Sequence, residues 1–100
     1  MTVTVHDNPS ANRFEAEVDG KPAGFAAYIR NDNLVVYPHT VVDPAFEGQG
    51  VGGTLARAAL DDARERGLPV LATCPFVHGW MERHPEYQDL AYENRSAVSD

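Results

Sequence analysis

The sequence predicts one α+β domain built on a mixed, mostly antiparallel sheet of about five strands. Three observations support this fold class. Short segments of the first half alternate apolar and polar residues between turn signals, a helical period begins at Val51, and a wholly apolar run follows at 70–73. The expected order is four strands, a helix, a strand and a helix, which describes an antiparallel meander followed by one crossover.

The first three strands are predicted from alternation and turn chemistry. Residues 2–5 and 14–18 alternate with the period of a half-buried strand, and the turn residues Asn8-Pro9-Ser10 separate them. Asp19-Gly20 is a strong two-residue hairpin signal, and the third strand is expected at 24–29. These segments therefore predict the start of the meander.

The fourth strand is predicted over residues 34–42, which are rich in valine and are expected to pair with the third strand. Pro38 lies inside this segment and lacks a backbone donor. We therefore expect a bulge or irregular pairing at that point. Asp43-Pro44 ends the strand.

The second half predicts a helix, a strand and a short helix. The first helix runs from Val51 to the cap residue Gly67, with an apolar face made of Val51, Leu55, Ala58, Ala59 and Ala63. The run 70–73 predicts a central strand that is buried on both faces and paired in parallel. Residues 76–83 predict a short helix, stopped by His84-Pro85. We expect one domain over 1–92 and a frayed tail over 93–100.

Composition limits the classes of function. The chain has 100 residues, a formal net charge of −7 and only 8 Lys and Arg residues, which argues against a nucleic-acid partner. An acidic surface also suits a cationic amine or a basic partner, although solubility is the simpler explanation. No stretch approaches the ~18 apolar residues of a membrane helix, and the start lacks a signal-peptide layout, so we expect a cytoplasmic protein without a membrane partner. Cys74 is the only cysteine, and no metal site is expected.

A glycine-rich turn, Gly48-Gln49-Gly50-Val51-Gly52-Gly53, lies between the fourth strand and the first helix. Glycine lets the backbone approach an anion, and the first amides of a helix point at it, so phosphate is the natural ligand. The turn also satisfies the dinucleotide pattern G-x-G-x-x-G. However, a meander precedes it and Cys74 stands where an acidic residue would be needed, so that fold is rejected. No Gly-Lys-Ser or Gly-Lys-Thr follows, which excludes a nucleotide-triphosphate loop.

Residues 41–52, Val41-Val42-Asp43-Pro44-Ala45-Phe46-Glu47-Gly48-Gln49-Gly50-Val51-Gly52, resemble the acetyl-CoA signature of the GCN5-related N-acetyltransferases, R/Q-x-x-G-x-G/A. The chain also resembles the short single-domain members of that family, over nearly its whole length. The further matching segments are Phe14-Glu15-Ala16-Glu17-Val18-Asp19-Gly20, His39-Thr40, Cys74-Pro75-Phe76-Val77 and Arg83-His84-Pro85-Glu86-Tyr87.

The resemblance implies a minimal fold of this family, with a pyrophosphate-binding helix after the fourth strand and acetyl-CoA as cofactor. The fourth strand would pair with the pantetheine arm, and the Val42 amide would hold the thioester carbonyl. Two positions depart from the family: Glu47 replaces Arg or Gln near the expected pyrophosphate, and Trp80 replaces a Tyr that would protonate the thiolate. The residues assigned to the cofactor are Val41, Val42, Glu47, Gly48, Gln49, Gly50, Val51, Gly52, Gly53, Thr54, Cys74, Phe76 and Trp80.

Cys74 and His39 are the candidate catalytic residues. The Cys74 thiol would act as nucleophile, proton donor or thiol neighbour, and its alternative role is that of a small buried hydrophobe. His39 would act as general base, with His78 as a second candidate, although a lone histidine is commonly structural. His84 is expected to satisfy carbonyls at a helix end. For the aromatic residues of the short helix, the alternative to binding the cofactor is packing in the core.

The resemblance implies an acetyl-CoA-dependent N-acetyltransferase in which an amine, on a small molecule or a protein, attacks the thioester directly. Two alternatives remain open: a module that binds CoA without efficient transfer, and a small interaction domain. Typical members have extra helices and a strand pair that build the acceptor site, and the chain is too short for both. We therefore expect an acceptor groove that is open, or that a homodimer or another partner completes.

Overall fold

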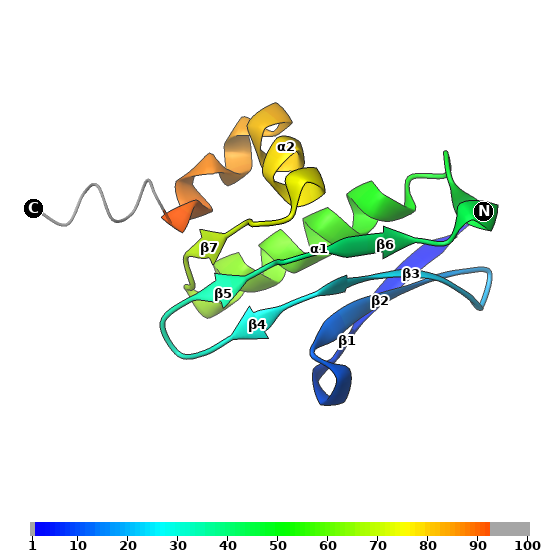
Figure 1. Cartoon of the computed structure of the whole chain (residues 1–100), viewed down its shortest axis with the longest axis horizontal. Helices are drawn as coiled ribbons and strands as arrows, with labels where there is room; N and C mark the ends of the chain where they lie inside the picture. Colours follow the sequence, from blue (N-terminus) through cyan, green and yellow to red (C-terminus); the bar gives the residue numbers. More distant parts are fainter. Residues whose placement is uncertain (1, 93–100) are drawn as a thin grey trace, which may run out of the picture.

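The computed structural model describes residues 2–92, which form a bent layer of strands with two helices (Figure 1). This is the α+β class that the sequence predicts. Short 3-10 helices lie at η1 (Pro9–Ala11), η2 (Pro44–Phe46) and η3 (Pro85–Leu90). The strands and α-helices in chain order are β1 (Val3–Asn8), β2 (Arg13–Val18), β3 (Lys21–Ala27), β4 (Ile29–Arg30), β5 (Val35–Val36), β6 (Thr40–Val42), α1 (Val51–Arg66), β7 (Val70–Leu71) and α2 (Pro75–Arg83).

The first three strands form the predicted antiparallel meander. Val3 pairs with Val18 across β1 and β2, and Val18 pairs with Lys21 across β2 and β3. The predicted hairpin turn is present: Asp19 and Gly20 both have positive φ, 51° and 83°, as a tight two-residue turn between twisted strands requires. The structure extends β1 to Asn8, three residues beyond the predicted end.

The third and fourth predicted strands are each broken into two. The third becomes β3 and β4, separated by Tyr28, and the fourth becomes β5 and β6, separated by residues 37–39. As a result the strands form two sheets, with the orders β1-β2-β3-β6 and β4-β5-β7. Pro38 lies at the second break, where its missing donor ends one ladder before the next begins.

Helix α1 supplies much of the core. It packs against β1, β2 and β3, and Figure 1 shows it running behind β5 and β6. The predicted face is largely correct, but it is wider than predicted because Ala56 and Leu60 are also buried, while Ala58 is only half-buried. The helix ends at Gly67, whose φ of +70° confirms the predicted cap. The buried residues of α1 are Val51, Leu55, Ala56, Ala59, Leu60 and Ala63.

The apolar run 70–73 forms a shorter strand than predicted, in a different place. Strand β7 contains only Val70 and Leu71, and it pairs in parallel with β5 as expected. The prediction of a central strand is wrong: β7 is the last strand of its sheet, with only an isolated bridge from Val70 to Ala91 on its other side. The predicted burial of the run on both faces is also only partly correct, since Val70 is buried, Leu71 and Ala72 are half-buried and Thr73 is exposed. A short strand at a sheet edge is covered less than a central strand would be.

The short helix α2 and η3 complete the described part of the chain. His84 follows α2, and its Nδ1 lies 2.7 Å from the Trp80 carbonyl oxygen, which confirms the predicted helix-end role. The predicted tail at 93–100 lies outside the described residues. Among residues 2–92, neither helix has the length and apolar character that crossing a bilayer requires.

Candidate functional site

The candidate site begins where the chain changes partner between β5 and β6. The amide of Val35 donates to the Pro69 carbonyl at 3.1 Å, and the amide of Tyr37 donates to the Leu71 carbonyl at 3.1 Å. Odd-numbered residues therefore face β7 before Pro38. Beyond it they face β3 instead, because the His39 carbonyl accepts from Ala27 at 3.0 Å. The same pattern continues just past the end of β6, where the Asp43 amide donates to the Ala23 carbonyl at 2.8 Å.

This reversal leaves one edge of β6 open. Because odd-numbered residues bond to β3, the backbone groups of Thr40 and Val42 point to the opposite side, where β6 has no strand neighbour. The Val42 amide, the predicted donor to the thioester carbonyl, belongs to this open set. Val41 does not: its backbone pairs with Phe25, and its side chain is exposed on the outer face.

The glycine-rich turn lies between η2 and α1, as predicted. Gly48 and Gly50 have φ of +83° and +81°, and a β-carbon at either position would meet nothing within 4 Å. Gly50 is the N-cap of α1 and offers no side-chain cap, so the first amides of the helix have no side-chain acceptor there. The first turn of α1 also contains no acidic residue. This end of the helix therefore presents an open, positively polarised backbone.

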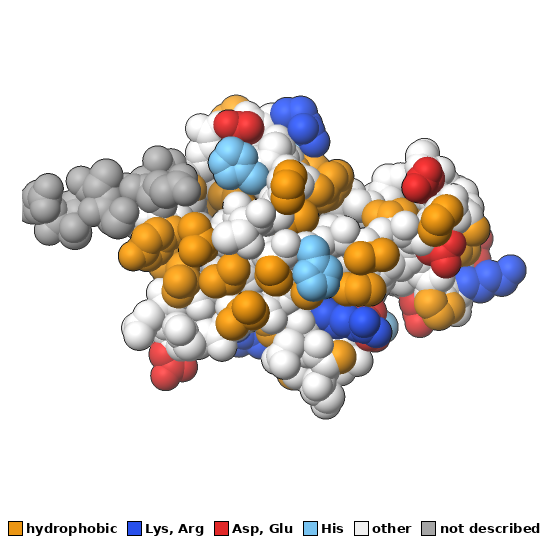
Figure 2. All heavy atoms as spheres, viewed as in Figure 1, with side chains coloured by type: hydrophobic (Ala, Val, Ile, Leu, Met, Phe, Trp, Pro, Cys, Tyr) orange, Lys and Arg blue, Asp and Glu red, His pale blue; other side chains and the backbone are white. Residues whose placement is uncertain are grey.

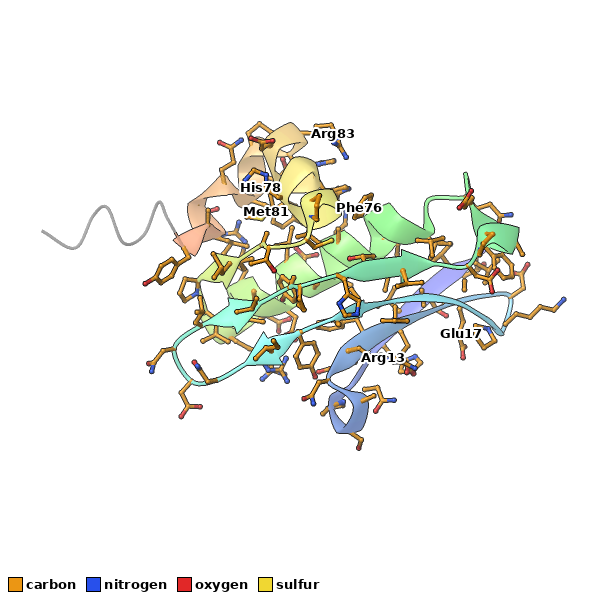
Figure 3. All side chains as sticks on the ribbon, in the orientation of Figure 1. Arg13, Glu17, Phe76, His78, Met81 and Arg83 are labelled. Carbon is orange, nitrogen blue, oxygen red and sulfur yellow. The ribbon has the colours of Figure 1, made fainter. Side chains whose placement is uncertain are left out.

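Gly52 of the turn serves packing within the protein, whereas Gly53 leaves room for a side chain. A β-carbon on Gly52 would lie 2.9 Å from the Phe76 ring, and one on Gly53 would lie 3.4 Å from the Trp80 indole nitrogen. Gly52 therefore lets α2 approach the start of α1, and Figure 3 shows Phe76 at the end of α2 nearest that start. Thr54 uses its hydroxyl locally, donating to the Gly50 carbonyl at 2.8 Å.

Gln49 and Glu47 are the two long polar side chains of the turn region. The Gln49 Oε1 atom is buried and has no hydrogen-bond partner among the described residues. A buried acceptor without a donor is costly, so a bound donor at this turn would be stabilising. Glu47 is exposed and follows η2, and its carboxylate makes no ion pair within residues 2–92.

Cys74 lies across the open edge of β6. Its side chain is 4% exposed, and its Sγ lies 3.9 Å from the Thr40 hydroxyl. Its amide donates to the Tyr37 carbonyl at 3.0 Å, which fixes the start of α2 against the break in the strand. Thr40 was not singled out from the sequence beyond the His-Thr match. Alternation along a strand could have found it, once the break at Pro38 was located.

His39 and Cys74 are not in contact. His39 is exposed on the outer face of the sheet, where its ring packs edge-on against Phe25 with centroids 5.9 Å apart. Thr40, the next residue, projects to the other face, toward Cys74. His78 is also exposed and lies 3.7 Å from Glu82. The structure thus pairs the candidate thiol with a hydroxyl instead of an imidazole.

Trp80 is buried, with 6% of its surface exposed, and neighbouring side chains cover its ring. His84 stacks on the indole with centroids 3.6 Å apart, and the Arg57 guanidinium lies 5.3 Å from the ring. Phe76 is different, since it is 40% exposed beside the glycine-rich turn. Core packing therefore describes Trp80, whereas Phe76 is accessible. Arg57 is a cation beside the site that was not singled out from the sequence, although it stands one turn after Gly53.

The arrangement fits an acyl-CoA on three grounds. A helix start with open glycines suits a pyrophosphate, an unpaired strand edge suits the amide-bearing arm of pantetheine, and the Thr40 and Cys74 side chains line the space beside that edge. No group of three His, Cys, Asp or Glu side chains in residues 2–92 is placed to hold one metal ion.

Comparison with known families gives the class of the protein. The model of the GCN5-related N-acetyltransferase family matches residues 13–90, which include every strand except β1, the glycine-rich turn and both helices. The chain belongs to this family. Its fold also matches the solution NMR structure of a GCN5-like protein from Staphylococcus aureus, with a TM-score of 0.66, 27% identity and coverage of 88% of this chain and 86% of that one.

Curated relatives agree with this assignment. The chain is 34% identical over 94 residues to the uncharacterized N-acetyltransferase MJ1207 of Methanocaldococcus jannaschii, covering 85% of this chain and 40% of that protein. It is 35% identical over 57 residues to human Protein NATD1, covering 57% of this chain and 50% of that protein. The chain therefore spans about half the length of the curated relatives it matches, or less.

Proposed function

We propose that this protein binds acetyl-CoA and transfers its acetyl group to an amine. One observation carries the proposal: the open edge of β6 ends at a turn that leads into the uncapped start of α1. A strand edge and a helix start together offer two kinds of backbone donor, for amides and for phosphates. Membership of the GCN5-related family supports the same function.

Different backbone amides of the chain would bind different parts of acetyl-CoA. The amides that open α1 would hold the pyrophosphate, and the Val42 amide would donate to the thioester carbonyl as negative charge develops on its oxygen. Acetyl-CoA supplies an activated acyl group. In the reaction the amine nitrogen forms a bond to the carbonyl carbon, the carbon–sulfur bond breaks, CoA leaves as the thiolate, and the amine loses a proton. Positioning by the β6 edge would supply much of the rate.

Cys74 is best placed as a proton donor or thiol neighbour of the leaving sulfur. Its Sγ faces the Thr40 hydroxyl, while the exposed His39 faces the other side of the sheet. Within residues 2–92 the Cys74 thiol contacts the Thr40 hydroxyl and no imidazole that would activate it as a nucleophile. This favours direct attack by the amine over a covalent intermediate on Cys74. His39 is retained as a candidate base on the outer face.

Calorimetric titration with acetyl-CoA tests the proposal, using two variants of the turn that act in opposite directions. Gly50→Asp places a carboxylate at the N-cap, where it repels a phosphate, so we expect a loss of binding of tenfold or more. Because Gly50 has a φ of +81°, we also expect a stability loss of about 1 kcal/mol. Glu47→Gln removes the exposed carboxylate, so we expect binding to tighten by about two- to fivefold, less at high salt. Absence of binding by the parent protein at millimolar acetyl-CoA would refute the proposal.

A second candidate function is a module that binds CoA without efficient transfer. The burial of Cys74 and the exposed Glu47 favour it, because one limits access to the thiol and the other weakens affinity for phosphate. Release of free thiol from acetyl-CoA in the presence of amines separates the two functions. Binding with no amine-dependent thiol release would assign the module.

A further inference from the structure

A surface hollow lies on the outer face of the sheet, the face away from α1. It has a volume of about 440 Å³, within the range of small-ligand sites. Its floor includes the apolar residues Phe25 and Val41 from β3 and β6. Charged residues from β2, and one that follows β6, surround this floor: Arg13, Glu15, Glu17 and Asp43. Figure 3 shows Arg13 at the start of β2 and Glu17 farther along the same strand.

The charges of the hollow do not cancel. Arg13 is bound to Glu15, with Nε 2.7 Å from Oε2, and its guanidinium stacks over Phe25 at 4.4 Å. This guanidinium, with Asn8 as a second donor, lowers the pKa of Glu15, so that pair is a neutral, satisfied unit. Asp43 accepts a hydrogen bond from the Ala45 amide at 2.9 Å. Glu17 makes no hydrogen bond or ion pair within residues 2–92, so three carboxylates face one guanidinium.

The hollow adjoins the proposed transfer site. Val41, in its floor, lies between Thr40 and Val42, whose backbone groups line the open edge of β6. Glu17 lies two strands away, on β2. Neighbouring strands are about 4.8 Å apart, so β2 and β6 are separated by about 10 Å with β3 between them. An extended aliphatic chain of this length could hold one end near Glu17 and the other beside Val41, with its methylenes over Phe25.

We propose that this hollow binds a small linear aliphatic amine that carries a second positive charge, with the second ammonium at Glu17. The role of the bound amine as acetyl acceptor rests on the proposed function. The selection of dications by the hollow is independent of that function. The unpaired carboxylate gives the charge selectivity, and the Phe25 and Val41 surface favours an aliphatic chain over a compact polar cation.

The test is an NMR titration of backbone amides with two matched amines. The first is 1,6-diaminohexane, and the second is n-hexylamine, which has the same chain and one ammonium. We expect the diamine to shift the amides of Glu17, Phe25 and Val41 and to bind about fivefold more tightly than hexylamine, as one ion pair allows. Glu17→Gln should remove the preference for the diamine. The control Glu65→Gln removes an equal charge from α1 and should leave the preference intact.

Each outcome decides the matter. Equal affinity for the two amines, a preference that survives Glu17→Gln, or shifts confined to another surface would overturn the proposal. The titration is done without acetyl-CoA, so its result is independent of the calorimetry. If the diamine binds as expected but acetyl-CoA does not bind at all, the site stands and the acetyltransferase function fails. If acetyl-CoA binds and the diamine shows no preference, only this inference fails.

Discussion

Residues 35–37 and residues 40–42 belong to one continuous stretch of chain, but they meet the rest of the molecule in opposite ways. The first group is closed: β5 has a strand on each side, and Tyr37 sends its hydroxyl to the Ala59 carbonyl at 2.6 Å. The second group is open: β6 has β3 on one side only. The space-filling view shows exposed apolar side chains and a central histidine on the face that both groups share (Figure 2).

Charged groups reinforce the closed half. Arg30, next to β5, lies 3.3 Å from Asp62 of α1, and Arg66 lies 2.7 Å from the same carboxylate. The Tyr28 hydroxyl donates to Asp7 of β1 at 2.7 Å. These contacts join β1, β4 and the last turns of α1, so the far end of the helix is held in place. The open half can therefore keep unpaired backbone without loss of the fold.

The comparison teaches that one break in a strand separates a stabilising segment from a binding segment. If this is correct, substitutions in the closed half should change the free energy of unfolding, and substitutions at the open half should change ligand affinity with little effect on stability.

The largest effect is expected for Tyr37→Ala in the closed half. The side chain is 1% exposed, and its removal leaves a large cavity and deletes the hydroxyl hydrogen bond to the Ala59 carbonyl. We expect the free energy of unfolding, measured with urea, to fall by about 3–5 kcal/mol. Tyr37→Phe, which keeps the ring, should cost only about 1–2 kcal/mol. A loss below about 1 kcal/mol for the alanine variant would show that this half is not the stabilising one.

The second-largest effect is expected at alkaline pH, which should lower the stability contributed by the closed half. Burial, and then the charge of Asp62, raise the pKa of Tyr37 above its ordinary value, and burial raises the pKa of Tyr28 in the same direction. The folded state thus keeps these protons while the unfolded chain loses them above a pH of about 10. The stabilisation is fully present below that pH and is lost as pH rises beyond it. Between pH 9 and pH 11, the urea concentration at the unfolding midpoint should fall less for Tyr37→Phe than for the parent protein. Tyr92 is exposed, so Tyr92→Phe should behave like the parent.

A smaller effect should separate two neighbouring glycines at the open half. Alanine is favoured over glycine in a helix by about 1 kcal/mol, and Gly53→Ala gains this because its β-carbon has room beside Trp80. Gly52→Ala should lose it, because the new methyl group meets the Phe76 ring. We expect thermal unfolding to place the two variants about 1 kcal/mol apart, and Phe76→Ala to remove the difference. Equal stabilities in the parent background would contradict the packing role of Gly52.

Local signals in the sequence were enough for the meander and the helix. The Asp19-Gly20 turn, the alternation of 14–18 and the cap at Gly67 each depend on the conformations of a few adjacent residues. The glycine-rich turn was predicted for the same reason, since positive φ at Gly48 and Gly50 is a local property. The role of His84 at the end of α2 also follows from its immediate neighbours.

The tertiary structure alone decided what depends on distant partners. Pro38 indicated an irregularity, but only the partners of the flanking strands show that the backbone reverses there and that the Thr40 and Val42 amides face an open edge. The same reversal places Thr40 beside Cys74 and turns His39 to the outer face. Residue types and spacing specify which groups can do chemistry. Which of them meet is set by long-range pairing, and a shift of one residue in that pairing exchanges the two faces of the strand.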